Sequence, residues 1–231
     1  MAIKIALIHP SYGRPDLACK IFEEWCSTCK NPKDIEYLIG LDSCDPKADM
    51  YPQKITLSRE YTKWGRVMIQ SGDSTDSVKA SYRMAKQISD TTEILFQISD
   101  DTGPIQDWDV KLIETFGICD NFKEPKSLFV GDGYWPFGTV FVHPIINRAL
   151  YDKLGFILYP DYTSMFADND FTEVCRKLNC FILAPQLVFQ HRHYTKGMTP
   201  FDETYARRNN QVEFNKNQAI FLERQKRGFD L

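Results

Sequence analysis

Two adjacent carboxylates close a short apolar stretch in the middle of the chain. Residues 94–96 are apolar, and Ser99, Asp100 and Asp101 follow them before a Gly-Pro break. Short apolar runs closed by turn residues are typical of buried strands. In open α/β sheets, ligands bind at the carboxyl ends of the strands. The pair therefore indicates either a Mg²⁺ or Mn²⁺ site shared with substrate phosphates, or a polar turn that closes a strand.

Two histidines stand at the end of another predicted strand. Residues 181–189 have strand character, and His191 and His193 follow two residues apart. Side chains at this spacing on an extended segment point the same way. Either histidine is a candidate to complete a metal site with Asp101, although imidazole suits Mn²⁺ less well than it suits zinc.

Further polar groups follow the first two predicted strands. Residues 9–15 form a loop before a helix, and a helix N-terminus favours phosphate binding. This loop has neither the GxGxxG nor the P-loop spacing. Asp42 follows the second strand, where an acidic residue either contacts a nucleotide's ribose or base edge or forms a turn.

Two further segments, the acidic residues near 168–170 and the aromatic loop at 132–137, can be explained either by a structural role or by a functional one. Asp168 and Asp170 lie near the start of a predicted helix, where negative charge is favoured, so helix capping accounts for both. The loop 132–137 is rich in aromatic residues, including Trp135. Such residues either stack on a sugar ring or pack in the core.

The elements that would position these groups alternate between strand and helix. This order predicts a mostly parallel sheet with helices on its faces. Residues 54–69 have no clear pattern. Strands are expected at 3–8, 35–41, 94–98, 128–131, 139–142 and 181–189, and helices at 17–26, 77–88, 108–116, 144–154 and from about 168 to 178.

Composition narrows the class of protein. The 231 residues are 43% hydrophobic with a net charge of −3, which suits a globular protein and gives no overall nucleic-acid signature. No apolar run is long enough to span a membrane, so we expect no membrane insertion. Seven cysteines, an odd number, indicate free thiols in a reducing cytoplasm. The tail from residue 201 is basic, which suits a solvated helix face, a lid or a patch for an anionic acceptor.

These groups, in this order, resemble the GT-A-fold glycosyltransferases that use nucleotide sugars, and the family 2 group in particular. The segment 10–15 resembles that family's first nucleotide-binding loop, and Asp42 falls at its acidic, nucleoside-contacting position. Ser99, Asp100 and Asp101 fall where the family has its Asp-x-Asp metal motif, with Ser99 in place of the first aspartate.

The segment 167–171, with Arg176 after it, resembles the family's Glu-Asp-x-Asp segment and the arginine that follows. Ala167 stands in place of the glutamate. In the family the next aspartate is the base that deprotonates the acceptor, and Asp168 is the matching residue. A softer resemblance links the chain to small phage-encoded members, which would place it in a host cytoplasm.

The resemblance implies a GT-A-like (Rossmann-like) α/β domain over residues 1–200, with a basic helical extension at 201–231 packed on it. It implies a metal-dependent, inverting transfer from a nucleoside-diphosphate sugar, with a UDP-sugar favoured, Mn²⁺ or Mg²⁺ as cofactor, and modified DNA as one candidate acceptor. The expected roles are nucleotide binding by Pro10, Ser11, Tyr12, Arg14, Asp42 and Asp100, metal binding by Asp101, His191 and His193, base catalysis by Asp168, and acceptor or sugar contacts by Trp135 and Asp170.

Two other functions are compatible with the same pattern. One is a non-catalytic module that binds nucleotide sugars. The other is a nucleotidyltransferase, since a fold alone does not define a reaction. A nucleotidyltransferase is expected to have a glycine-rich, basic loop after the first strand, whereas residues 11–15 offer one glycine and one arginine.

Overall fold

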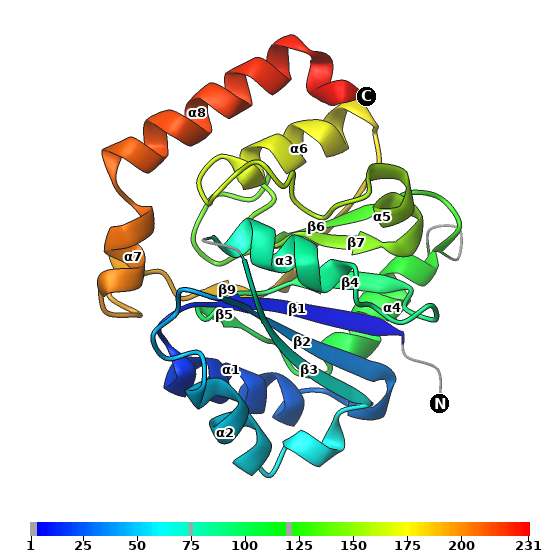
Figure 1. The fold of residues 1–231 in the computed structure, drawn as a ribbon. Helices are drawn as coiled ribbons and strands as arrows, with labels where there is room; N and C mark the ends of the chain where they lie inside the picture. The colour runs from blue at the N-terminus through cyan, green and yellow to red at the C-terminus, as the bar shows by residue number, and fades with distance from the viewer. Residues whose placement is uncertain (1–3, 74–75, 119–121) are drawn as a thin grey trace.

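A seven-stranded sheet forms the centre of the computed structural model, which describes residues 4–73, 76–118 and 122–231 (Figure 1). The strand order is β3-β2-β1-β4-β7-β6-β8. All neighbours pair in parallel except β7, which is antiparallel to both β4 and β6. The mostly parallel α/β sheet predicted from the sequence is confirmed. The strands are β1 (Ile5–Ser11), β2 (Ile35–Asp42), β3 (Arg66–Gly72), β4 (Ile94–Gln97), β6 (Ser127–Gly131), β7 (Ile145–Asn147) and β8 (Phe181–Val188).

Helices cover both faces of this sheet, as the alternation of side chains along each strand requires. On β1, Ile5 and Leu7 pack toward one face and Ala6 and Ile8 toward the other. The first face is covered by α1 (Pro15–Ser27), α2 (Met50–Leu57) and α4 (Trp108–Ile118). The second is covered by α3 (Ser77–Ala85), α5 (Arg148–Leu154) and α6 (Ala167–Lys177). Short 3₁₀ turns occur at Pro32–Asp34, Tyr61–Lys63, Tyr194–Lys196 and Gly228–Asp230.

Two element predictions between residues 139 and 154 are wrong. Residues 139–142 are not a strand, and the sheet is completed instead by β7, which begins directly after Pro144. Helix α5 starts only at Arg148, because the Asn147 side chain caps it by accepting a hydrogen bond from the Leu150 N–H at 3.0 Å. The unclear segment 54–69 contains the end of α2 and the start of β3.

A second, two-stranded sheet lies at the carboxyl end of the central one. It pairs β5 (Thr102–Gly103) with β9 (Gln190–His191), with Thr102 opposite His191. This pairing places the histidine segment beside the Asp100-Asp101 turn, although the two are ninety residues apart in the sequence.

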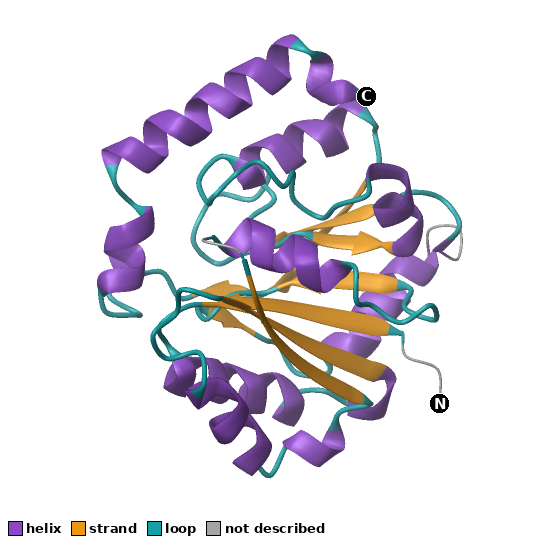
Figure 2. Cartoon of the chain, in the orientation of Figure 1, coloured by secondary structure: helices purple, strands orange, loops and turns teal. Residues whose placement is uncertain are grey.

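The last two α-helices, α7 (Glu203–Arg208) and α8 (Gln211–Lys226), run along the outside of the molecule (Figure 2). Helix α7 lies at the carboxyl edge of the central sheet, and α8 returns from there toward α6. Arg224 joins the helices through an ion pair with Asp170, at 2.6 Å. Among the described residues, no helix is both long and apolar enough to cross a membrane.

Candidate active site

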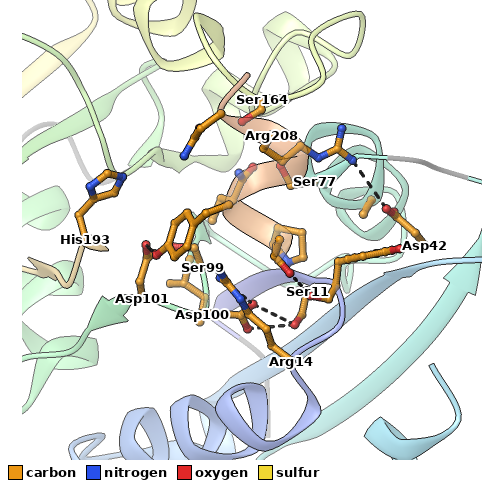
Figure 3. A pocket seen from close by; sticks show the side chains of 18 of the residues that line it. Ser11, Arg14, Asp42, Ser77, Ser99, Asp100, Asp101, Ser164, His193 and Arg208 are labelled. Carbon is orange, nitrogen blue, oxygen red and sulfur yellow. Dashed lines mark hydrogen bonds and ion pairs between the residues drawn. The ribbon is translucent and has the colours of Figure 1, made fainter. Parts of the chain in front are cut away.

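A cavity of about 290 Å³ opens where β1, β2 and β4 end, beneath α7 (Figure 3). Its position is the one expected for a ligand site in an open α/β sheet. It brings together every residue that the sequence predicted for the nucleotide and the metal. These residues are Pro10, Ser11, Tyr12, Arg14, Asp42, Asp100, Asp101, His191 and His193.

Asp100 holds the first loop against the central turn. Its carboxylate is bonded to the His9 ring at Nε2, 2.9 Å away, and accepts a hydrogen bond from the Ser11 hydroxyl, also at 2.9 Å. The other ring nitrogen of His9 lies 2.8 Å from the Tyr37 hydroxyl. The Arg14 guanidinium is 3.8 Å from the same carboxylate. Asp100 thus fixes the residues around the cavity floor, and His9 is a member of this network that the sequence did not single out.

Asp101 is surrounded by donors. The Ser99 hydroxyl donates to Oδ1 at 2.5 Å, the Tyr205 hydroxyl donates to Oδ2 at 2.7 Å, and His191 Nε2 lies 3.4 Å from Oδ2. Burial raises the pKa of this carboxyl, but the hydrogen bonds from His191, Ser99 and Tyr205 outweigh burial and hold the pKa well below its usual range. Asp101 is therefore an anion in the cavity wall at neutral pH.

The two histidines differ in their protonation. Burial lowers the pKa of His191, but the hydrogen bond and charge of Asp101 outweigh it, and the net pKa is raised. Its Nδ1 atom is buried without a hydrogen-bond partner among the described residues. Burial and the neighbouring His191 lower the pKa of His193, whose Nδ1 lies 2.9 Å from the Thr195 hydroxyl. His191 can thus carry charge at the cavity, whereas His193 is neutral at pH 7.

We tested whether this donor set suits a divalent ion. Within the described residues, no three His, Cys, Asp or Glu side chains are arranged to hold a metal. Asp101 and His191 supply two close donors, with His191 Nε2 3.4 Å from Asp101 Oδ2. Mg²⁺ is commonly held by one or two carboxylates together with substrate phosphates. The residues fit an ion shared with a bound diphosphate, and they do not form a site from protein ligands alone.

Helix α7 and the turn before it cover the cavity. Asp202 accepts two hydrogen bonds from the Arg14 guanidinium, at 2.6 and 2.7 Å, and the Thr204 hydroxyl donates to the Tyr12 carbonyl oxygen at 3.0 Å. Arg208 lies 4.0 Å from Asp42. Figure 3 marks this ion pair with a dashed line. Sequence reasoning proposed a lid as one role of the basic tail but did not identify these contacts.

A second cavity, of about 250 Å³, adjoins the first and contains Asp168. The two cavities share residues from the end of β4 and from β9, including Gln97, Ser99 and His191. Asp168 is half-buried, and burial raises its pKa although the Asn169 N–H donates to its Oδ1 at 2.9 Å. The helix dipole was expected to make this carboxylate less basic, whereas the net effect of its surroundings is the opposite.

Backbone conformation places Asp168 at this cavity. Phe166, directly before α6, has φ +66°, a left-handed value that non-glycine residues rarely adopt. Such conformations cost of order 1–3 kcal/mol and often occur at functional sites. The turn directs Met165 and Asp168 to the same cavity wall.

Two predicted contact residues lie outside both cavities. Asp170, expected to contact the sugar or acceptor, is 1% exposed and is held by Arg224 and by the Tyr162 hydroxyl at 3.0 Å, so its carboxylate is engaged within the protein. Trp135 is 56% exposed in a loop whose turn is fixed by Asp132, which accepts a hydrogen bond from the Trp135 N–H at 2.9 Å. Trp135 lines neither cavity.

Comparison with solved structures identifies the fold. S. aureus TarS 1–349 in complex with UDP-GlcNAc matches with a TM-score of 0.61 at 14% identity, over 81% of this chain and 57% of that one. The mannosyltransferase PcManGT from Pyrobaculum calidifontis, in complex with GDP-Man and Mn²⁺, matches with a TM-score of 0.61 at 10% identity, over 98% and 76%. The catalytic domain of Drosophila β1,4-galactosyltransferase 7 matches with a TM-score of 0.50 at 12% identity, over 87% and 75%. The expected GT-A-like fold is confirmed.

These matches are to structures and not to sequences. No protein-family model and no curated protein sequence matches the chain. The chain spans less than three fifths of the length of the TarS chains that it matches. None of these comparisons supports the expected link to phage-encoded enzymes.

Proposed function

We propose that this protein transfers a sugar from a nucleoside-diphosphate sugar to an acceptor hydroxyl. One observation carries the proposal: the cavity that collects the predicted nucleotide residues adjoins the cavity of Asp168, and the two meet at Ser99 and His191. A donor in the first cavity would thus have its sugar next to a carboxylate in the second. Holding both reactants in this way supplies much of the rate enhancement of a two-substrate reaction.

The first cavity supplies groups for each part of the donor. Asp42, at the end of β2, and Arg14 both line this cavity, and their proposed partners are the nucleoside and the diphosphate respectively. A UDP-sugar is the first donor to test, because the TarS structure was solved with UDP-GlcNAc. We propose that residues 1–200 form the transferase domain and that the extension from residue 201 closes over the bound donor through α7.

Asp101 and His191 are the proposed protein ligands of a divalent ion, with His193 beside them at the cavity wall. When bound, such an ion neutralises the charge that develops on a leaving diphosphate. The anionic state of Asp101 suits this role, as does the position of His191 Nε2, 3.4 Å from Asp101 Oδ2.

Asp168 is the proposed general base. The acceptor oxygen forms a bond to the anomeric carbon while the bond from that carbon to the diphosphate oxygen breaks, and the acceptor proton moves to Asp168. With the base in the second cavity, the acceptor oxygen attacks from the side opposite the leaving group, so the product has inverted configuration. The raised pKa of Asp168 makes it a stronger base than an ordinary carboxylate.

A panel of nucleotide sugars, screened by thermal shift with and without Mn²⁺, tests donor binding. At a ligand concentration of about 100 Kd, binding adds about 2.7 kcal/mol to the free energy of unfolding, so the matching donor is expected to raise the Tm by several degrees. Release of nucleoside diphosphate then separates an enzyme from a non-catalytic binding module. Release of pyrophosphate from a nucleoside triphosphate would show a nucleotidyltransferase instead.

The variant Asp101→Asn tests the proposed metal ligand. It keeps the size of the side chain but removes the charge, so we expect Mn²⁺ to add little to donor affinity in this variant, measured by calorimetry. An equal gain from Mn²⁺ in wild type and Asp101→Asn would exclude Asp101 as a ligand.

A further inference from the structure

A third cavity, of about 350 Å³, opens next to the two already described. It lies between the segment after β9 and the start of α8. It meets the first cavity at His193 and Asn209, and the second at Met165. Its lining consists of Met165, His193, Tyr194, Asn209, Asn210, Gln211 and Phe214, and we call it the α7–α8 groove.

We propose that the α7–α8 groove binds a neutral saccharide as the acceptor, an inference that rests on the glycosyl transfer proposed above. The groove combines two aromatic rings, Tyr194 and Phe214, with carboxamides such as Asn209 and Gln211. A pyranose has an apolar C–H face that packs on an aromatic ring and a rim of hydroxyls that both donate and accept hydrogen bonds. Carboxamides also donate and accept, so they suit this rim.

Charge argues against an anionic acceptor in the groove. Within the described part of the chain, no Asp, Glu, Lys or Arg lines it. Among the described residues, the cavity of Asp168 also has no Lys or Arg in its lining. Phosphate recognition relies chiefly on Lys and Arg side chains, which neither of these two linings contains.

The basic tail does not compensate for this lack. Arg207 lies over the Tyr12 ring at 3.9 Å and 3.9 Å from Asp42, and Arg208 also faces Asp42. Arg224 is buried against Asp170. These arginines act within the protein, and exposed basic residues of the tail such as Lys216 lie outside the groove lining, so the acceptor proposed for the groove is a neutral saccharide and not modified DNA.

The walls of the groove are held in place before a ligand arrives. The Tyr194 ring lies 4.7 Å from that of Tyr205, and the Phe214 ring lies 5.1 Å from that of Phe166, measured between centroids. The Asn210 side chain caps α8 by accepting hydrogen bonds from the Val212 and Glu213 N–H groups, at 3.0 Å each. A preorganised aromatic surface lowers the cost of binding.

Other polar groups remain open to a ligand. The Asn209 carboxamide makes no hydrogen bond with the described residues, and Gln211 uses its amide nitrogen on Asn215, at 2.8 Å, which leaves its oxygen unbonded. A saccharide seated here would extend past Met165, with one hydroxyl in the cavity of Asp168.

Binding can be tested on the full chain by nitrogen-15 NMR. Maltotriose, cellotriose and chitotriose serve as neutral probes and a single-stranded thymidine dodecamer as the anionic one. We expect at least one trisaccharide to shift the side-chain amide signals of Asn209 and Gln211, and the dodecamer to leave them unchanged. Shifts with the dodecamer and not with the trisaccharides, or no shifts with any probe, would overturn the inference.

Variants of residues in the groove test whether the saccharide binds there. Gln211→Ala removes an exposed hydrogen-bonding group, so we expect it to weaken saccharide binding about three- to tenfold, as the loss of about one hydrogen bond implies. Val212→Ala is the matched control, because Val212 is the next residue on the helix, 76% exposed and outside the groove lining. Equal binding by wild type and Gln211→Ala, together with equal binding by Phe214→Ala, would place the saccharide elsewhere and overturn the inference.

Hydrolysis of the donor separates this inference from the proposed function. Release of nucleoside diphosphate without acceptor depends on the donor cavity and not on the groove. If no nucleotide sugar is bound or cleaved while trisaccharides still shift Asn209 and Gln211, glycosyl transfer fails and the saccharide site stands. If donor is cleaved but trisaccharides neither bind nor accelerate cleavage, the saccharide site fails alone.

Discussion

The hydroxyl of Tyr205 donates a hydrogen bond to Oδ2 of Asp101 at 2.7 Å, although the two residues are 104 positions apart. This bond joins α7 to the turn at the end of β4. The Arg14 guanidinium lies 4.3 Å from the centre of the Tyr205 ring and also bonds Asp202. One tyrosine therefore links the C-terminal extension to the proposed metal ligand and to the first loop.

We predict that Tyr205→Phe lowers the free energy of unfolding by about 1.5 kcal/mol, because hydrogen bonds to charged groups contribute about that much. Urea unfolding at pH 7 measures the change. Tyr194→Phe is the matched control, since its hydroxyl makes no hydrogen bond with the described residues. Equal stability of wild type and Tyr205→Phe would show that the bond does not hold α7 in solution.

The Asp170–Arg224 pair gives a second prediction. Removing one partner of a buried ion pair costs about 3–5 kcal/mol when the other charge is left unpaired, and Arg224 keeps a second carboxylate, Asp230 at 2.7 Å, so the low end of this range applies. We expect Asp170→Asn to lose stability of this order and, at a temperature where it remains folded, to keep its kcat, since Asp170 lines neither cavity of the proposed transferase site. Unchanged stability with a large fall in kcat would restore the substrate-contact role predicted from the sequence.

His143 should make stability depend on pH. Burial lowers its pKa to about 4, from 6.5 in the unfolded chain, and its Nε2 donates to the Phe189 carbonyl oxygen at 2.7 Å. Because the unfolded state binds more protons between these two values, stability falls as the pH drops below 6.5 and levels off below about 4. From pH 8 to pH 5 the loss is about 2 kcal/mol, at 1.36 kcal/mol per pKa unit.

The variant His143→Gln isolates this contribution, because it removes the titrating ring and retains an N–H donor. Its stability relative to wild type, measured by urea unfolding at pH 8, 6.5 and 5, should rise as the pH falls. A pH-independent difference would show that His143 does not titrate in this window. His191 affects stability at higher pH than His143 does. Its pKa is raised in the folded state, so its contribution to the free energy of unfolding is complete below about pH 6.5 and is lost as the pH rises through the folded pKa.

The donor cavity was predictable from the sequence because parallel strands end at the same edge of a sheet. Polar residues after the predicted strands at 3–8, 35–41 and 94–98 had to meet, and Ser11, Asp42 and Asp101 line one cavity. The pleat of the chain likewise indicated that His191 and His193 point the same way, and both line this cavity with their ring centroids 5.1 Å apart.

Other parts depend on contacts that local sequence does not encode. The hydroxyl of Tyr205 and the carboxylate of Asp202 reach the cavity only because α7 folds back over it. The sequence did not predict this fold, because a polar, basic tail is equally typical of a solvated helix. His9 looked like part of a loop, whereas β1 continues through Pro10 to Ser11 and buries its ring. Helix position alone did not distinguish Asp168 from Asp170, and only the family resemblance gave them different roles; in the structure the ion pair with Arg224 sets Asp170 apart.

Asp168→Asn provides the last and most direct prediction. The change keeps the size of the side chain and its ability to accept a hydrogen bond from the Asn169 N–H, but removes the group that takes the acceptor proton. General-base catalysis typically contributes 10²–10⁴-fold, so we expect kcat to fall by about a hundredfold or more. The donor KM should change little, because Asp168 lies outside the donor cavity.

Asp161→Asn, an exposed position close in sequence, is the control for loss of one carboxylate and should transfer at the wild-type rate. The pH profile gives a second readout. Because burial raises the pKa of Asp168, the acidic limb of kcat should lie above the range of an ordinary aspartate and should disappear in Asp168→Asn. Wild-type transfer by Asp168→Asn, or a product that retains the donor's anomeric configuration, would assign the base to another group.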